Sequence, residues 1–336
     1  MGRPKFFTPD TVWTEHYGMS AFTRLWQRAP LWRTVLISTG ACGIFSVLFP
    51  APWLTTRLPY YQTVTDKVGH MLGRSSAAQT NNAEGEGRRM VSQPPLDAQF
   101  EGVIPFAGRQ LPLPAGKWHP VLNYQDDVSH GEILTSIFVR SERGVVTGFI
   151  IAQATTQSLP SSDTQMLQDM CHSGFNFTVG DLPQDGTHTE CWLTSPIRVV
   201  NNLFLTSNQA LQGLLSSPLF IPPALQRLGM MGFDLPPILV DAGWTHIEKS
   251  KSGTGVDFAT IHTLLSPAEA GQRAVPGAPE DWSRAGMNNS PMVADFVKRS
   301  DTWLKNWLPY LRKGYNSTLE GGPLPAAAAT DPGFHG

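Results

Sequence analysis

The chain has 336 residues, of which 41% are hydrophobic and 15% are charged. Residues 1–94 carry 10 Lys and Arg against 5 Asp and Glu, whereas residues 95–320 carry 15 against 21. Because a nucleic-acid-binding domain presents a basic face, this acidic balance argues against nucleic acid as a partner. The chain is long enough for one domain with a full core, or for two small ones.

The N-terminal part is organised around an apolar segment without a charged residue, which runs from Thr34 to Thr56. About 20 helical residues, at roughly 1.5 Å of rise each, cross a hydrocarbon layer of about 30 Å. We therefore predict a single transmembrane helix over residues 34–54, in contact with membrane lipids. A cleaved signal peptide and a soluble or interfacial helix are the alternatives, although Phe49-Pro50-Ala51 is a poor cleavage site.

The charges that flank this segment predict its orientation. Arg24, Arg28 and Arg33 crowd its N-terminal side, whereas basic residues are more widely spaced beyond it. The positive-inside rule then places residues 1–33 in the cytoplasm as a leader and the rest of the chain outside the cytosol. Residues 55–100 become rich in Ser, Ala, Gln, Asn and Gly, which is typical of a flexible linker.

Residues 101–315 have the pattern of an α+β domain, mainly antiparallel, with peripheral helices. Alternating apolar residues predict two β-hairpins, the first from Glu132–Arg140 and Arg143–Ala154. The second pairs Pro237–Ile247 with Val256–Leu265 across a turn rich in Gly and Ser. Further strands are expected over His119–Tyr124 and Ile197–Ser207.

Helices are expected over residues 161–171, 208–216, 222–231 and 290–314. The last begins at Ser290-Pro291, and Pro309 is expected to interrupt its hydrogen bonds near its end. Its Trp303 and Trp307 share one side, which either packs on the sheet or forms a face for a membrane or a partner protein. Residues 316–336 are rich in Pro, Ala and Gly, so we predict a disordered tail.

Three features together resemble uncharacterised single-pass envelope proteins of proteobacteria, which carry a Pro-Leu-Pro-x-Gly-x-Trp opening strand. These features are the segment Leu111-Pro-Leu-Pro-Ala-Gly-Lys-Trp118, the Leu235-Pro236-Pro237 entry to the second hairpin and the Trp-rich last helix. The resemblance covers residues 111–315 and implies no activity. It implies a bacterial inner-membrane protein whose main domain is periplasmic.

Common catalytic and cofactor motifs are absent from the sequence. It contains no Gly-x-Ser-x-Gly turn and no His-Glu-x-x-His or Cys-x-x-Cys pair, and Gly116-Lys117 is followed by Trp118 where a P-loop needs Ser or Thr. Gly253-Thr254-Gly255 lacks the third glycine of a dinucleotide site. We therefore predict no cofactor.

Cys171 and Cys191 could be two unpaired thiols, and three further interpretations are open. Outside the cytosol they are expected to form a disulfide. Together with His172 and His188 they could instead bind Zn²⁺, although the spacing is not that of a standard zinc finger. In the third interpretation Cys191 is a nucleophile with His188 as its base, which a strand conformation would oppose because the two side chains would face opposite ways.

His246 and Glu248 share one face of a predicted strand, and His262 lies on the strand expected to pair with it. The three could line a cleft or bind a metal, or they could belong to a solvated face. Two functional hypotheses follow. The first is a membrane-anchored, non-catalytic accessory or structural subunit of a cell-envelope complex, with a membrane-protein partner. The second is a periplasmic enzyme, or a ligand- or metal-binding domain, tethered to the inner membrane.

Overall fold

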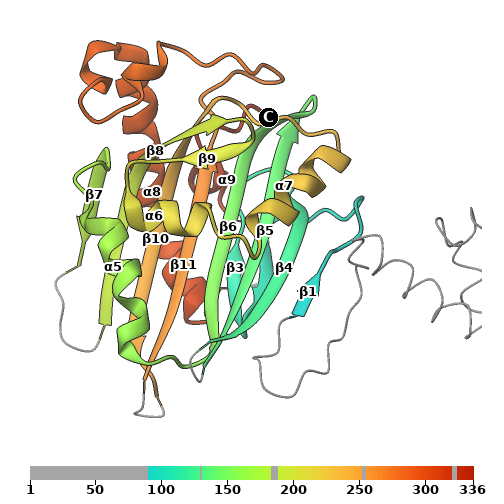
Figure 1. Ribbon diagram of the computed structural model, residues 1–336, viewed down its shortest axis with the longest axis vertical. Coiled ribbons are helices and arrows are strands. Elements are labelled where there is room, and N and C mark those ends of the chain that lie inside the picture. The colour runs from blue at the N-terminus through green and yellow to red at the C-terminus, as the bar shows by residue number, and fades with distance from the viewer. Residues whose placement is uncertain (1–89, 129–130, 183–187, 252–254, 320–323) are drawn as a thin grey trace, which may run out of the picture. The chain divides into compact units, whose positions relative to one another are not determined.

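The computed structural model describes residues 90–336 apart from 129–130, 183–187, 252–254 and 320–323 (Figure 1). The predicted leader, the predicted transmembrane helix and the linker up to residue 89 lie outside the described residues. Within the described ranges, no helix combines the length and the apolar character needed to cross a membrane.

A nine-stranded antiparallel sheet forms the centre of the domain (Figure 1), with strand order β1-β4-β5-β6-β11-β10-β8-β7 and β9 paired to β8. A small second sheet pairs β2 (Val103–Phe106) with β3 (Arg109–Pro112). The main strands are β1 (Met90–Ser92), β4 (His119–Val128), β5 (Gly131–Glu142), β6 (Val145–Gln157), β7 (Thr178–Asp181), β8 (His188–Val200), β9 (Leu203–Leu205), β10 (Ile238–Lys249) and β11 (Val256–Leu265). The predicted mainly antiparallel α+β domain is confirmed, as are the β5–β6 and β10–β11 hairpins.

Helices cover both faces of this sheet. One face, here called the α5–α7 face, carries α5 (Gln165–His172), α6 (Gln209–Leu215) and α7 (Ile221–Met230). The other, the α8 face, carries α8 (Pro291–Tyr315) and the short α9 (Ala326–Ala329). Short 3₁₀ turns complete the domain: η1 (Ser161–Thr164), η2 (Pro279–Asp281) and η3 (Met287–Asn289).

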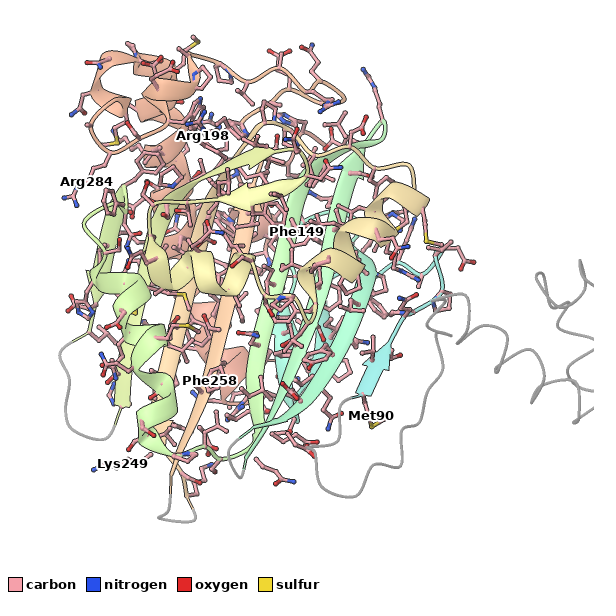
Figure 2. The ribbon with its side chains drawn as sticks, in the orientation of Figure 1. Met90, Phe149, Arg198, Lys249, Phe258 and Arg284 are labelled. Atoms are coloured by element: carbon pink, nitrogen blue, oxygen red, sulfur yellow. A yellow bond between two sulfur atoms is a disulfide. The ribbon has the colours of Figure 1, made fainter. Side chains whose placement is uncertain are left out.

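Each central strand contributes side chains to two hydrophobic cores, one on each face of the sheet. In β10, Leu239 and Ile247 pack into the core on the α5–α7 face, whereas Val240 and Trp244 pack into the core on the α8 face. Phe149 of β6 points towards the α5–α7 face (Figure 2) and contacts Phe204 with ring centroids 5.3 Å apart. Because both faces of these strands are buried, apolar residues also occupy consecutive positions, as at Ile150 and Ile151 of β6, which pack in opposite cores.

Helix α8 agrees with its predicted bounds to within one residue at either end. It continues through Pro309, which is exposed, to Tyr315. A proline on the solvent side is tolerated because helices open their hydrogen bonds there and packing of the opposite side holds them. Trp303 and Trp307 are 5% and 1% exposed and pack in the core, so of the two interpretations the structure has the one in which they pack on the sheet, and the alternative of a membrane or partner face is wrong.

The predicted disordered tail is also wrong for residues 324–336. They pack on the α8 face, where the backbone N–H of Ala115 donates to the carbonyl of Ala329 at 2.8 Å. The buried carboxylate of Asp331 pairs with Arg140, 191 positions earlier. The predicted flexible linker is likewise wrong for residues 90–92, because they form β1, which pairs with β4.

Candidate functional site

Cys171 and Cys191 are joined by a disulfide, with their Cα atoms 6.2 Å apart. Both are buried, and the bond fastens α5 to β8. Metal binding and nucleophilic attack need a thiolate, which a disulfide does not offer. His172 is exposed and its Nδ1 lies 2.8 Å from the carbonyl of Gln168 on its own helix, so it takes no part in a site with His188.

Four ionisable side chains lie together on the α8 face where β8 and β10 pair. The register sets His188 opposite Glu248 and Glu190 opposite His246. Because side chains two apart on a strand share a face, two imidazoles and two carboxylates occupy alternate corners of one rectangle. We call these four residues the His/Glu quartet.

Glu190 is the buried member of the quartet. Its carboxylate accepts a hydrogen bond from Trp244 Nε1 at 2.7 Å and two from Arg312 Nε of α8 at 2.8 and 3.1 Å. Burial alone would raise the pKa of Glu190, but the contacts with His246, Trp244 and Arg312 and the charge of Arg312 outweigh it and hold that pKa below its usual value. Glu190 is therefore a fixed carboxylate that ties α8 to the sheet.

His246 lies between the two carboxylates of the quartet. Its Nδ1 is 3.9 Å from Glu190 Oε2, and its Nε2 is 3.7 Å from Glu248 Oε2. Both distances exceed those of a direct hydrogen bond, so the ring lies beside both carboxylates without bonding to either. The centroids of the His246 and Tyr315 rings are 4.4 Å apart.

The quartet does not have the geometry of a metal centre. The rings of His188 and His246 stack with centroids 6.0 Å apart and planes 25° apart. Lone pairs of imidazole nitrogens lie in the ring plane, so stacked rings do not aim both at one ion. No group of three or more His, Cys, Asp or Glu side chains in the described part of the chain is arranged to hold a metal ion.

An open pocket of about 460 Å³ lies over the quartet, lined by His188, His246, Glu248, Lys249 and Asn316. It lies at the end of β10 where Figure 2 labels Lys249. The quartet thus offers imidazole and carboxylate groups to a polar ligand from solvent.

Two further polar residues, Tyr315 and Arg109, lie next to the His/Glu quartet on the side of Glu248. Arg109 Nη2 donates to the Tyr315 hydroxyl at 3.1 Å, and its guanidinium lies 4.1 Å from the centre of the ring. Burial raises the pKa of Tyr315 above its usual value; the charge of Arg109 opposes this effect and Glu248 reinforces it. The hydroxyl therefore stays protonated and acts as a hydrogen-bonding group.

His262 lies on the opposite face of the sheet, so the structure does not bring it together with His246 and Glu248. Its Nδ1 is 2.8 Å from Asp241 Oδ2, and its Nε2 is 3.1 Å from Thr260 Oγ1. This is the atom order of a hydrolase triad. All three residues have no exposed surface, so a substrate cannot reach them. Burial raises the pKa of Asp241, and His262 opposes that rise.

Glu190, Arg312 and Asp241 were not predicted from the sequence as site residues. Glu190 follows His188 by two residues, so strand periodicity would have placed both on one face had the strand been predicted to begin at His188. Arg312 comes from a helix more than 100 residues later, and no local pattern signals that contact.

Comparison with known proteins does not assign the chain to a family. No protein-family model matches the chain, and neither a curated protein nor a solved structure matches it significantly.

Proposed function

We propose that this protein is a membrane-tethered, non-catalytic accessory subunit of a cell-envelope complex. Residues 34–54 anchor it in the bacterial inner membrane, residues 1–33 are cytoplasmic, and the folded domain works in the periplasm with a membrane-protein partner. The observation that carries this proposal is the buried Cys171–Cys191 disulfide in a chain whose N-terminal part contains the uncharged apolar segment from Thr34 to Thr56. Disulfides of this structural kind persist in oxidising compartments.

The chemistry of the domain supports a non-catalytic role. The Asp241–His262–Thr260 arrangement lies inside the sheet, away from any substrate. Glu190 is already engaged by Trp244 and Arg312, which suits a structural tie better than a general base. The uncharged anchor and the linker that follows it suit a domain that acts by holding a partner near the membrane.

Placement is tested in cells with the full chain. The protein should remain in membranes after carbonate extraction. Fused after Gly336, a reporter enzyme that works only in the periplasm should be active, and one that works only in the cytoplasm should be inactive. Cys171 and Cys191 should resist a thiol-alkylating polymer until a reductant is added. Release by carbonate, or free thiols at both positions in cells, would contradict the proposal.

The partner is tested by crosslinking in intact membranes followed by purification in mild detergent. A stoichiometric membrane protein should co-purify, and the two masses should appear together by native mass spectrometry. A matched sample in which residues 34–54 are replaced by an unrelated transmembrane segment separates contacts of the anchor from those of the domain. Recovery of the chain as a lone monomer from crosslinked membranes would overturn the accessory-subunit proposal.

The second candidate function is a tethered domain that binds a small polar ligand in the open pocket over the His/Glu quartet. The pocket itself favours it, because His188, His246 and Glu248 line it beside Lys249. Diamines and dicarboxylates serve as probes in calorimetric titrations. Binding should be lost in His188→Ala and kept in His172→Ala, which removes an exposed imidazole outside the pocket. Absence of heat with both probe classes would remove this candidate.

A further inference from the structure

Arg140 of β5 is a buried cation whose counter-charge comes from the C-terminal segment. Its Nη1 and Nη2 donate to the two oxygens of Asp331 at 2.6 and 2.8 Å, and both side chains are almost fully buried. Among the described residues, Asp331 is the only one that forms an ion pair with Arg140. A buried cation that loses its carboxylate is strongly destabilising, so this site requires an acidic occupant.

The opening segment that includes Pro112-Leu-Pro-Ala-Gly-Lys-Trp118 builds the walls of this site. Trp118 lies under Arg140, with the guanidinium 4.8 Å from the ring centre, and its Nε1 donates to the carbonyl of Pro114 at 2.8 Å. The carbonyl of Ala115 accepts from Arg140 Nη1 at 2.7 Å. The motif on which the family resemblance depends is therefore an arginine-binding structure.

Two glycines leave the room that the site needs. A Cβ on Gly116 would lie 2.8 Å from Arg140 Cδ and 2.9 Å from Phe334 Cε2, and Gly116 has a φ of +101° that other residues rarely adopt. A Cβ on Gly148 would lie 2.6 Å from the Trp118 ring. We call Ala115, Gly116, Trp118, Arg140 and Gly148 the Arg140 socket.

Residues 324–336 lie in the socket as a bound peptide would. Ala329, Asp331 and Gly333 are buried, whereas Thr330 between them is exposed. The segment is bound as the short helix α9 followed by a turn, in which the backbone N–H of Phe334 donates to the carbonyl of Asp331 at 3.1 Å. The backbone of the segment is held by Ala115 N and by Trp303 Nε1, which donates to the carbonyl of Ala328 at 3.0 Å.

The aromatic ring that follows the aspartate completes the recognition. Phe334, three residues after Asp331, has its ring centre 5.1 Å from the guanidinium of Arg140, so the cation lies against two aromatic rings. The segment therefore offers one carboxylate and one ring at a fixed spacing.

Open grooves flank the segment. A pocket of about 540 Å³ is lined by Leu113 and Gly116 together with Ala326 and Ala329. A larger groove of about 1260 Å³ includes residues of α8, of the loop at 267–276 and of the segment itself. Solvent therefore reaches the exposed side of the segment, whereas Ala329, Asp331 and Gly333 stay buried. A second copy of the segment can enter the socket once the resident segment has left it.

We propose that the Arg140 socket is a recognition site for a short segment with an aspartate followed three residues later by an aromatic ring. Residues 324–336 are its resident occupant, and a second copy of this chain supplies the same segment in trans. The exchanged contacts are identical to the internal ones, which makes such swapping a low-cost route to a dimer. The proposal does not depend on the accessory-subunit function.

The first test uses the native sequence of the segment. A protease recognition sequence is inserted between Leu319 and Leu324 of the full chain and cleaved after folding, so that the socket forms normally. A fluorescent peptide of residues 324–336 should replace the cleaved segment, as followed by anisotropy. The same peptide with Asp331→Asn should bind about 100-fold more weakly, because it leaves the buried cation unpaired.

Matched variants of the cleavable chain locate the site. Arg140→Met should lose the peptide, whereas Arg284→Met, which removes an exposed arginine that lines neither groove, should retain it. Equal binding of the native peptide and the Asp331→Asn peptide, or no replacement of the cleaved segment within a day at 37 °C, would overturn the proposal.

Exchange between uncut chains is tested by complementation. Asp331→Asn has an intact socket and a defective segment, and Arg140→Met has the reverse. Mixed together, they should form a heterodimer with one repaired socket, seen by light scattering after size exclusion, while each alone stays monomeric at the same concentration. A mixture of folded variants that remains monomeric would contradict exchange in trans. If either variant fails to fold, differently tagged wild-type chains are mixed and must co-purify to sustain it.

Discussion

Asp241 and His262 lie on neighbouring strands with Oδ2 and Nδ1 2.8 Å apart, and neither side chain reaches solvent. The residue that faces His262 across the β10–β11 pair is Gly243. The ring of His262 occupies the space that a side chain at position 243 would fill. The polar pair in the core on the α5–α7 face therefore depends on a glycine in the middle of a buried strand.

Gly243→Ala should destabilise the domain. The added Cβ would lie 2.8 Å from His262 Nδ1 and 3.1 Å from Asp241 Oδ2. Overpacking of this kind costs about 1–3 kcal/mol, measured as the change in the free energy of unfolding in urea. Gly229→Ala is the control, because nothing lies within 4 Å of its Cβ and it sits in helix α7. That change should be neutral or stabilising by up to about 1 kcal/mol. Equal stability of the two variants would contradict the role given to Gly243.

The pH dependence of stability should carry a contribution from Glu190. Its pKa in the folded state is lower than the ordinary value of 4.5, so its contribution is complete above that value. The contribution is lost as the pH falls through the folded pKa, where protonation weakens the bonds to Arg312 and Trp244. In Glu190→Gln, the free energy of unfolding should therefore fall less steeply between about pH 5 and pH 3 than in the wild type. Glu280→Gln, at an exposed position, controls for the loss of a carboxylate, and identical slopes in all three proteins would count against this assignment.

The hairpins could be predicted because their signal is local. Alternating apolar residues in β5, β6, β10 and β11 match the period of two of a strand. Residues 188–196 of β8 were not predicted as a strand, and Pro196 is one reason, since proline is excluded from most central strands. Its position resolves the conflict. It falls between the residues 191–194 that pair with β7 and the residues 198–200 that pair with β9, where its missing N–H leaves no bond unmade.

The candidate site was only half predictable. Periodicity placed His246 and Glu248 on one face, but the quartet also needs the register of β8 against β10, which no local pattern specifies. The tail was mispredicted for a related reason. Its composition is that of a disordered segment, and the contact that orders it joins Asp331 to an arginine 191 positions away. Composition reports the average tendency of a segment, whereas one buried ion pair depends on a partner outside it.

Trp307→Ala tests whether α8 faces a core or a membrane. The side chain is 1% exposed and stacks on Trp303 and Tyr310, with ring centroids 5.9 and 5.4 Å away. Its removal should lower the free energy of unfolding by about 3–5 kcal/mol. Co-sedimentation of residues 90–336 with anionic vesicles should not change under conditions where the variant is folded. Met292→Ala, at an exposed position of the same helix, should change stability by less than about 0.5 kcal/mol. A loss of vesicle binding without a loss of stability would restore the membrane face.

Gln212→Ala should promote self-association through strand β9. The side chain of Gln212 accepts from the N–H of Thr206 at 2.8 Å and donates to the carbonyl of Phe204 at 3.1 Å. It thus satisfies backbone groups at the outer edge of β9, where a neighbouring strand would otherwise pair. Exposed Leu203 and Leu205 flank these groups, and an apolar edge with free backbone groups is a template for pairing with another chain.

The measurement is the average mass of residues 90–336 by light scattering over a range of concentrations. Gln212→Ala should associate at concentrations where the wild type is monomeric, and stability should fall by about 1 kcal/mol for each hydrogen bond lost. Gln165→Ala is the control, since that glutamine bonds only to the exposed Asp169 on helix α5. Gln212→Glu separates the two bonds, because a carboxylate keeps the acceptor for Thr206 and loses the donor to Phe204. A variant Gln212→Ala that stays monomeric would show that the twist or shortness of β9, and not the amide, protects this edge.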